Sequence, residues 1–99
     1  TRQKMADNGV VILGATVSKE QRKVIAGPDV QMRGFVFLKD ADNLVKDIST
    51  TFIDTLNEYL QTELQDLEDC KKRIKEKIIF KIKKSTGKDP LIIPAVIEL

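Results

Sequence analysis

Residues 67–99 read LEDCKKRIKEKIIFKIKKSTGKDPLIIPAVIEL, and this stretch decides the fold. Its first part carries apolar side chains at helical spacing, which form one stripe: Leu67, Cys70, Ile74, Ile78 and Ile82. Acidic residues precede this stripe and lysines follow it, as the helix dipole favours. Gly87 is placed to cap the helix, and Pro90 blocks its continuation. The apolar tail 91–99 then predicts a strand covered on at least one face, with Pro94 at an edge or bulge.

The N-terminal part predicts a hairpin. Residues 10–17 are rich in β-branched side chains, and a polar stretch separates them from a second apolar run at 23–26. Gly27 and Pro28 interrupt that second run, so we expect a bulge or kink before residues 30–32. A further short apolar run follows at 35–38. Residues 35–38 would form a fourth strand if they pair with the sheet.

A helix is predicted to begin near residues 39–42, where two carboxylates are available as N-caps. Its apolar positions recur along one stripe: Leu44, Ile48, Phe52, Leu56, Tyr59 and Leu60. The expected order is therefore β-β-(β)-α-α-β. Each amphipathic helix must bury its stripe, and a sheet supplies the surface. We therefore predict an α+β domain with a three- or four-stranded sheet and two antiparallel helices packed on one face.

Composition excludes several kinds of active site. The chain of 99 residues fits a single domain, with 17 Lys and Arg against 15 Asp and Glu, no His and one Cys. A chain without His has no imidazole base and no His-liganded zinc, and one Cys forms no intrachain disulfide. It also lacks a phosphate-binding loop, an apolar run of membrane-spanning length and a signal-peptide-like start. We expect a cytoplasmic domain without catalysis, cofactor, small-molecule ligand or membrane contact.

Charge is divided between the two predicted helices. Residues 40–69 are mostly acidic and residues 71–88 mostly basic. One interpretation is that opposite charges lie side by side on antiparallel helices and face water. A second is contact with the RNA backbone, and a third is a protein partner. The candidate RNA-contacting side chains are Lys72, Arg73, Lys77 and Lys84.

Three further positions are candidates for contact with a partner. Phe80 falls opposite Ile78 on the predicted helix, so it is either an exposed anchor or covered by another segment. Arg33 and Phe35 flank Gly34 where the second strand ends, and the glycine permits a positive φ or a close backbone approach. Arg33 either positions the chain or holds a carboxylate. For Cys70, a buried thiol is favoured over a reactive one.

Several segments together resemble the C-terminal domain of ribonuclease J, in the metallo-β-lactamase/β-CASP nuclease family. The resemblance is carried by MADNGVV at 5–11, GPDV at 27–30, RGFV at 33–36 and TGKDPLIIPAVIEL at 86–99. It covers nearly the whole chain. Immediately before Pro90 this sequence reads GKD, where the family is usually richer in basic residues.

The resemblance implies a zinc-dependent ribonuclease with 5′-to-3′ exonuclease and endonuclease activity in RNA maturation and decay. Its zinc ligands belong to a catalytic domain that is absent from these residues, so residues 1–99 are expected to form an accessory C-terminal domain. The family also implies that this domain supports self-association and full activity. The last strand and Phe80 are then expected to contact another subunit, with RNA contact by the basic helix as the alternative.

Overall fold

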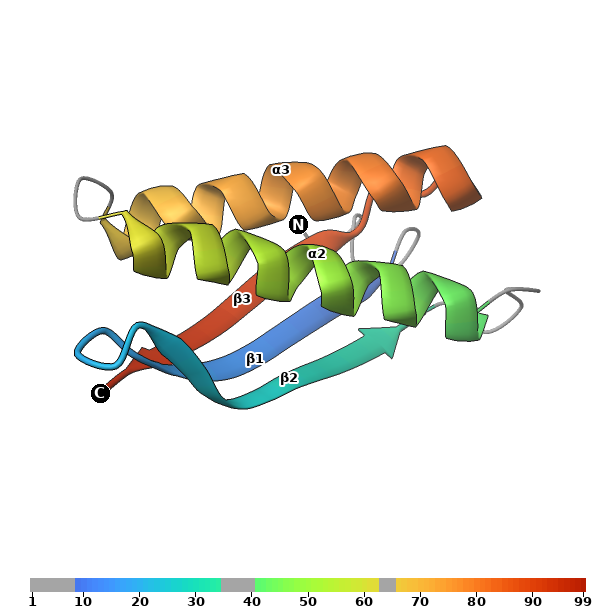
Figure 1. Ribbon diagram of the computed structural model, residues 1–99. Helices are drawn as coiled ribbons and strands as arrows, with labels where there is room; N and C mark the ends of the chain where they lie inside the picture. Colours follow the sequence, from blue (N-terminus) through green and yellow to red (C-terminus); the bar gives the residue numbers. More distant parts are fainter. Residues whose placement is uncertain (1–8, 35–40, 63–65) are drawn as a thin grey trace.

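The computed structural model describes residues 9–34, 41–62 and 66–99, and these form a sheet covered by two helices (Figure 1). The elements in chain order are β1 (Val10–Ser18), β2 (Lys23–Arg33), α2 (Ala41–Gln61), α3 (Leu67–Thr86) and β3 (Leu91–Glu98). The strand order in the sheet is β2-β1-β3. The pair β1–β2 is antiparallel and the pair β1–β3 is parallel. The predicted α+β class and element order are confirmed, while the apolar run 35–38 lies outside the described residues.

Both helices lie over the same face of the sheet, as Figure 1 shows. Every second residue of β1 points into the core, beginning with Val11, and β3 contributes Ile92 and Val96. The α3 stripe from Cys70 to Ile82 is fully buried. The residues of α2 that join this core are those the periodicity predicts: Leu44, Ile48, Phe52, Leu56, Tyr59 and Leu60. The fold is therefore a two-layer sandwich with its core between helices and sheet.

The ends of α3 follow from local chemistry. The Asp66 carboxylate accepts a hydrogen bond of 2.8 Å from the backbone N–H of Asp69, which satisfies one of the free donors of the first turn. At the other end Gly87 adopts φ +73° and its N–H donates to the Lys83 carbonyl. Both caps agree with the sequence. For α2, the described helix begins at Ala41, and Asp40 lies outside the described residues.

The strand β2 bends where the sequence predicted an irregularity. Its register against β1 shifts between Gly14 and Thr16, which pair with Asp29 and Ala26 respectively. The Gly27-Pro28 step lies in this shift. A second shift follows between Thr16 and Val17, which pairs with Val24, so the start of β2 is out of register with the rest of the strand.

Pro94 lies on an edge strand, as expected. The backbone N–H of Leu91 donates to the Gly9 carbonyl, and the N–H of Leu99 donates to the Val17 carbonyl. Hydrogen-bonding groups in a strand alternate in direction, so odd-numbered residues of β3 face β1 and even-numbered ones face the free edge. The missing N–H of Pro94 is therefore on the side where no strand pairs in the described structure.

Candidate interaction surfaces

Opposite charges join the two helices on their solvent side. Lys81 Nζ lies 2.9 Å from Asp47 Oδ1, and Arg73 Nη2 lies 3.1 Å from Glu58 Oε2. Lys77 Nζ is 3.9 Å from the same Glu58 oxygen. This is the first of the three interpretations of the charge division, and it accounts for part of the basic segment. Such exposed pairs contribute about 0.2–1 kcal/mol each.

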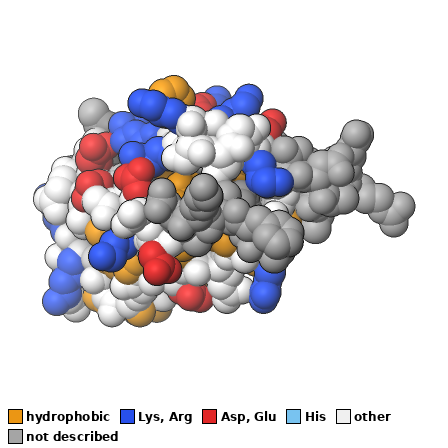
Figure 2. Space-filling view, turned by 90° about the vertical axis from the view of Figure 1, so that its right-hand side faces the viewer, with side chains coloured by type: hydrophobic (Ala, Val, Ile, Leu, Met, Phe, Trp, Pro, Cys, Tyr) orange, Lys and Arg blue, Asp and Glu red, His pale blue; other side chains and the backbone are white. Residues whose placement is uncertain are grey.

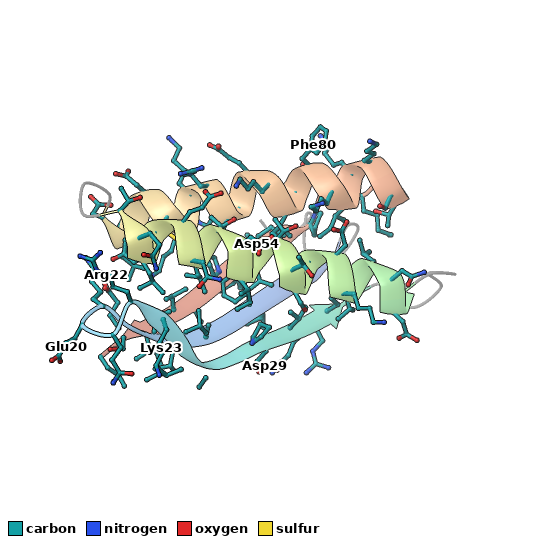
Figure 3. The ribbon with its side chains drawn as sticks, in the orientation of Figure 1. Glu20, Arg22, Lys23, Asp29, Asp54 and Phe80 are labelled. Carbon is teal, nitrogen blue, oxygen red and sulfur yellow. The ribbon has the colours of Figure 1, made fainter. Side chains whose placement is uncertain are left out.

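A groove of about 910 Å³ runs between the helices beside these pairs. Acidic side chains of α2, including Asp54, line one wall, and lysines of α3 line the other. Phe80 also lines the groove and is 67% exposed. Figure 3 shows its ring on the outer side of α3, away from the sheet. Of the two alternatives for Phe80, the structure shows the exposed one.

The four candidate RNA-contacting residues differ in environment. Arg73 and Lys77 share Glu58, so part of their charge is neutralised. Lys72 and Lys84 are exposed, and neither forms an ion pair with another described residue. Lys84 lines the groove, whereas Lys72 lines a second hollow beside β3. The four side chains are therefore not gathered into one patch.

The sheet face that points away from the helices has no covering element among residues 9–34, 41–62 and 66–99 (Figure 1). On β3 this face carries Ile93 and Ile97, which are 41% and 59% exposed. Ile12 of β1 pairs with Ile93 and is partly exposed. In Figure 2 hydrophobic side chains reach the surface in several places along the lower side, interspersed with charged groups. The apolar part of this face is formed by β3 with Ile12, whereas β2 contributes Asp29, Gln31 and Arg33.

Arg33 also lies on this face. It pairs with Val10 at the end of β2 that adjoins residues 9–10, and its side chain forms no ion pair with another described residue. Gly34 has φ +84°, and a Cβ there would come within 2.8 Å of the Gly9 Cα. Both the positive φ and the close approach predicted for this glycine are confirmed. Phe35, the other candidate contact, lies outside the described residues.

Cys70 and Tyr59 are buried and belong to the core rather than to a candidate contact surface. Cys70 is fully buried, and burial raises the pKa of its thiol to about 11. It is therefore a neutral, inert side chain at neutral pH. Tyr59 donates a hydrogen bond of 3.0 Å to Glu98 Oε2, and the Lys19 ammonium lies 5.1 Å from its ring centroid. Burial raises the pKa of the Tyr59 phenol.

Sequence reasoning selected the last strand as a contact but not the residues that share its outer face. Ile12, Gly14 and Asp29 join this face only through the register of β1 with its two neighbours. The available signal was the run 91–97, which is apolar at both odd and even positions. A strand that is covered on one face needs apolar residues at alternate positions and no others. The additional apolar residues of this run therefore indicate a contact on its second face.

Neither a metal centre nor a membrane span is found in the described part of the chain. No three Cys, Asp or Glu side chains there lie close enough together to hold a metal ion. No described helix is both long and apolar enough to cross a bilayer.

Known proteins are similar to this chain over nearly its whole length. The family described as the ribonuclease J C-terminal domain matches residues 1–99. A protein named Ribonuclease J 2 from Staphylococcus epidermidis is 29% identical over 98 residues, which are 99% of this chain and 18% of that protein. Ribonuclease J 2 from Staphylococcus aureus is 26% identical over the same shares of both chains. The chain thus spans less than a fifth of the length of these relatives, and it belongs to the ribonuclease J C-terminal domain family.

Proposed function

We propose that this domain is the non-catalytic C-terminal module of a cytoplasmic ribonuclease J and that it supports subunit assembly and full activity. The ribonuclease would act as a 5′-to-3′ exonuclease and an endonuclease in RNA maturation and decay. The observation that carries the proposal is the exposed apolar face of the sheet, because such a face on a stably folded module marks a contact with another protein surface.

The residues present do not suit the zinc ion that the nuclease family implies. The sequence has no His, and the described Cys, Asp and Glu side chains form no cluster that could hold a metal. Zinc would supply the hydrolytic chemistry in a catalytic domain elsewhere in the ribonuclease. No step of that chemistry is assigned to residues of this chain.

The helix layer offers a second contact for the same role. Phe80 is exposed beside a groove whose walls carry opposite charges. An aromatic ring at the rim of a charged groove is a common anchor in protein interfaces. We propose that Phe80 contacts another part of the assembled ribonuclease, as do Arg33 at the end of β2 and Phe35.

The assembly role is tested in the complete ribonuclease that carries this domain. Removal of residues 1–99 should lower the oligomeric state in sedimentation velocity and reduce exonuclease activity on a 5′-monophosphorylated RNA. The matched control is the same ribonuclease with Lys46→Ala, an exposed position on α2. An unchanged oligomer after removal of the domain would contradict the proposal.

RNA contact is the alternative function, and the unpaired lysines favour it. Lys72, Lys75 and Lys84 form no ion pair with other described residues, so their charge is available to phosphates. Substitution of Lys72, Arg73, Lys77 and Lys84 by Ala should then weaken binding of a single-stranded RNA and lower its salt dependence.

The ion pairs make a sharper version of this test possible. If phosphates are bound, Lys72→Ala with Lys84→Ala should reduce the salt slope more than Arg73→Ala with Lys77→Ala, because Glu58 already engages the second pair. Fluorescence anisotropy with labelled RNA at several salt concentrations gives both slopes. Identical slopes for the wild-type and quadruple variants would remove the RNA function.

A further inference from the structure

The groove between α2 and α3 carries two carboxylates without a counter-charge among the described residues. Asp54 of α2 and Glu76 of α3 line the groove from opposite walls, and both side chains are exposed. Neither is paired with a cation in residues 9–34, 41–62 or 66–99. The ion pairs that join the helices engage two other acids of the groove, Asp47 and Glu58. Asp54 and Glu76 therefore leave this part of the groove negative.

An exposed aromatic ring lies beside Glu76 on α3. Phe80 follows Glu76 by four residues, so the two side chains are neighbours on one side of the helix. The ring lines the same groove, and Figure 3 shows it on α3 with Asp54 on the neighbouring helix. Lys84 follows Phe80 by another four residues, which places it about 12 Å from Glu76 along the helix axis. The ring thus separates Glu76 from this exposed lysine.

The combination suits a guanidinium group better than other ligands. A guanidinium stacks flat on an aromatic ring while its N–H groups donate to carboxylates, so Phe80 and Glu76 can engage the same group. A phosphate would meet the negative Asp54 and Glu76, and an apolar side chain would exclude water from both carboxylates without pairing them. A lysine ammonium is a point charge and lacks the planar fork. The groove is therefore complementary to an arginine side chain.

We propose that this groove binds an arginine side chain carried by a segment of the ribonuclease outside residues 1–99. The guanidinium stacks on Phe80 and donates hydrogen bonds to Glu76, and Asp54 on the opposite wall attracts the same cation. The inference rests on the proposed function, in which Phe80 contacts another part of the ribonuclease, and it names the chemistry of that contact.

The weakness of such a site favours a segment that is attached to the domain. One exposed ring and two exposed carboxylates bind a single side chain with a dissociation constant of about a millimolar or weaker. A flexible tether supplies an effective concentration on the order of millimolar, whereas a separate protein in dilute solution stays far below that. This chain spans less than a fifth of the length of its relatives, so in such a protein a large remainder is attached to the domain. That remainder is the source of the arginine.

The test is site-specific photo-crosslinking in the complete ribonuclease. The photoreactive amino acid p-benzoylphenylalanine replaces Phe80, and in a control protein it replaces Lys75, which is exposed on α3 and lines a different hollow. Mass spectrometry identifies the linked peptide. We expect position 80 to link to an arginine-containing segment outside residues 1–99, and position 75 not to link to that segment.

Charge substitutions then test the two carboxylates. Asp54→Lys and Glu76→Lys are each combined with the label at position 80. Glu20→Lys is the matched control, because Glu20 is also exposed and forms no ion pair with a described residue. Both groove variants should lower the yield of the cross-link at least about fivefold, and Glu20→Lys should leave it unchanged. Circular dichroism melts establish that each variant is folded.

A charge exchange identifies the arginine itself. Replacement of the linked arginine by Glu should lower the cross-link yield as Glu76→Lys does. In combination with Glu76→Arg, the same replacement should restore the yield to within about threefold of the starting protein.

Three outcomes would overturn the inference. A cross-link from position 80 to a separate protein, or to residues 1–99 of a second subunit, would assign the groove to another occupant. A linked segment without arginine, or yields indifferent to Asp54→Lys and Glu76→Lys, would exclude the guanidinium. No cross-link from position 80 in the folded ribonuclease would show that the groove is open to water. None of these results alters the oligomeric state measured after removal of the domain, so the failure of this inference and that of the proposed function are distinguishable.

Discussion

The two faces of β3 have similar side chains but different roles. Ile92 and Val96 point toward the helices and are 3% and 8% exposed, whereas Ile93 and Ile97 point the other way and remain substantially exposed. The first pair belongs to the core, and the second contributes little to it. Hydrophobic content alone therefore does not identify which residues hold this fold. The apolar side chains that the fold does not need are the ones available for association.

The contrast between inside and outside is largest for two aromatic rings. Phe52 is fully buried on α2, and Phe80 is exposed on α3. Phe52→Ala should lower the free energy of unfolding by about 3–5 kcal/mol, because it removes buried area and leaves a cavity. Phe80→Ala should change it by less than about 0.5 kcal/mol. Urea denaturation of both variants measures the difference, and similar losses would contradict the contrast.

Adjacent residues of β3 test the two faces directly. Ile92→Ala should cost about 2–5 kcal/mol of unfolding free energy. Ile93→Ala should cost less than about 1 kcal/mol when measured at concentrations where the chain is monomeric, since water already reaches that side chain. Chemical denaturation at several protein concentrations separates folding from association. Equal losses of unfolding free energy in the dilute protein would mean that Ile93 on the outer face stabilises the fold as much as Ile92 does.

The free energy of unfolding at alkaline pH tests whether Cys70 is buried in the core. The pKa of the folded thiol is about 11, against 9.0 for an unperturbed one. The unfolded chain therefore loses this proton first, so the stability that the raised pKa provides is present below pH 9.0 and is lost as pH rises toward 11. The slope approaches about 1.4 kcal/mol per pH unit in that interval.

Cys70→Ala is the control for this slope, because lysines and Tyr59 also titrate at high pH. Urea midpoints of the variant should fall less steeply between pH 9 and 11 than those of the wild type. Parallel curves for the two proteins would show that the thiol is accessible to water in the folded state.

The smallest effect is expected for the exposed ion pairs of the helix layer. A double-mutant cycle on Glu58 and Arg73, with Ala at each position, should give a coupling of about 0.2–1 kcal/mol that falls with added salt. The same cycle on Asp47 and Lys81 is the internal comparison. A coupling above about 2 kcal/mol would mean that these exposed ion pairs stabilise the fold more than surface pairs do. That result would contradict the contrast between the buried core and the exposed surface.

Much of the fold followed from local chemistry in the sequence. The helical stripes, the acidic start of α3, the Gly87 cap and the irregular second strand each depend on a few neighbouring residues, and the structure confirms them. The position of Phe80 opposite Ile78 left exposure and coverage by another segment as alternatives, and the structure shows exposure.

The composition of the open sheet face could not be predicted because it depends on register. Asp29 and Ile12 share this face with Ile93 only because β2 and β3 pair with β1 at particular offsets, and a shift of one residue would turn them inward. The pairing of opposite charges across the two helices was the first of three interpretations of the charge division, and the structure shows it for Arg73 and Glu58. Which residues form the pairs depends on how the helices align, so the sequence did not identify them.

The central claim of the proposed function is that the outer face of the sheet carries the contact for subunit assembly. Sedimentation velocity of Ile93→Lys beside Phe80→Lys, over a range of concentrations, tests it most directly, because both side chains are exposed. Ile93 alternates with the core residue Ile92 and so faces away from the helices, whereas Phe80 lies on the outer side of α3 (Figure 3). The account predicts that the wild type and Phe80→Lys form dimers with rising concentration while folded Ile93→Lys stays monomeric. A dimer that survives Ile93→Lys and is lost with Phe80→Lys would contradict it.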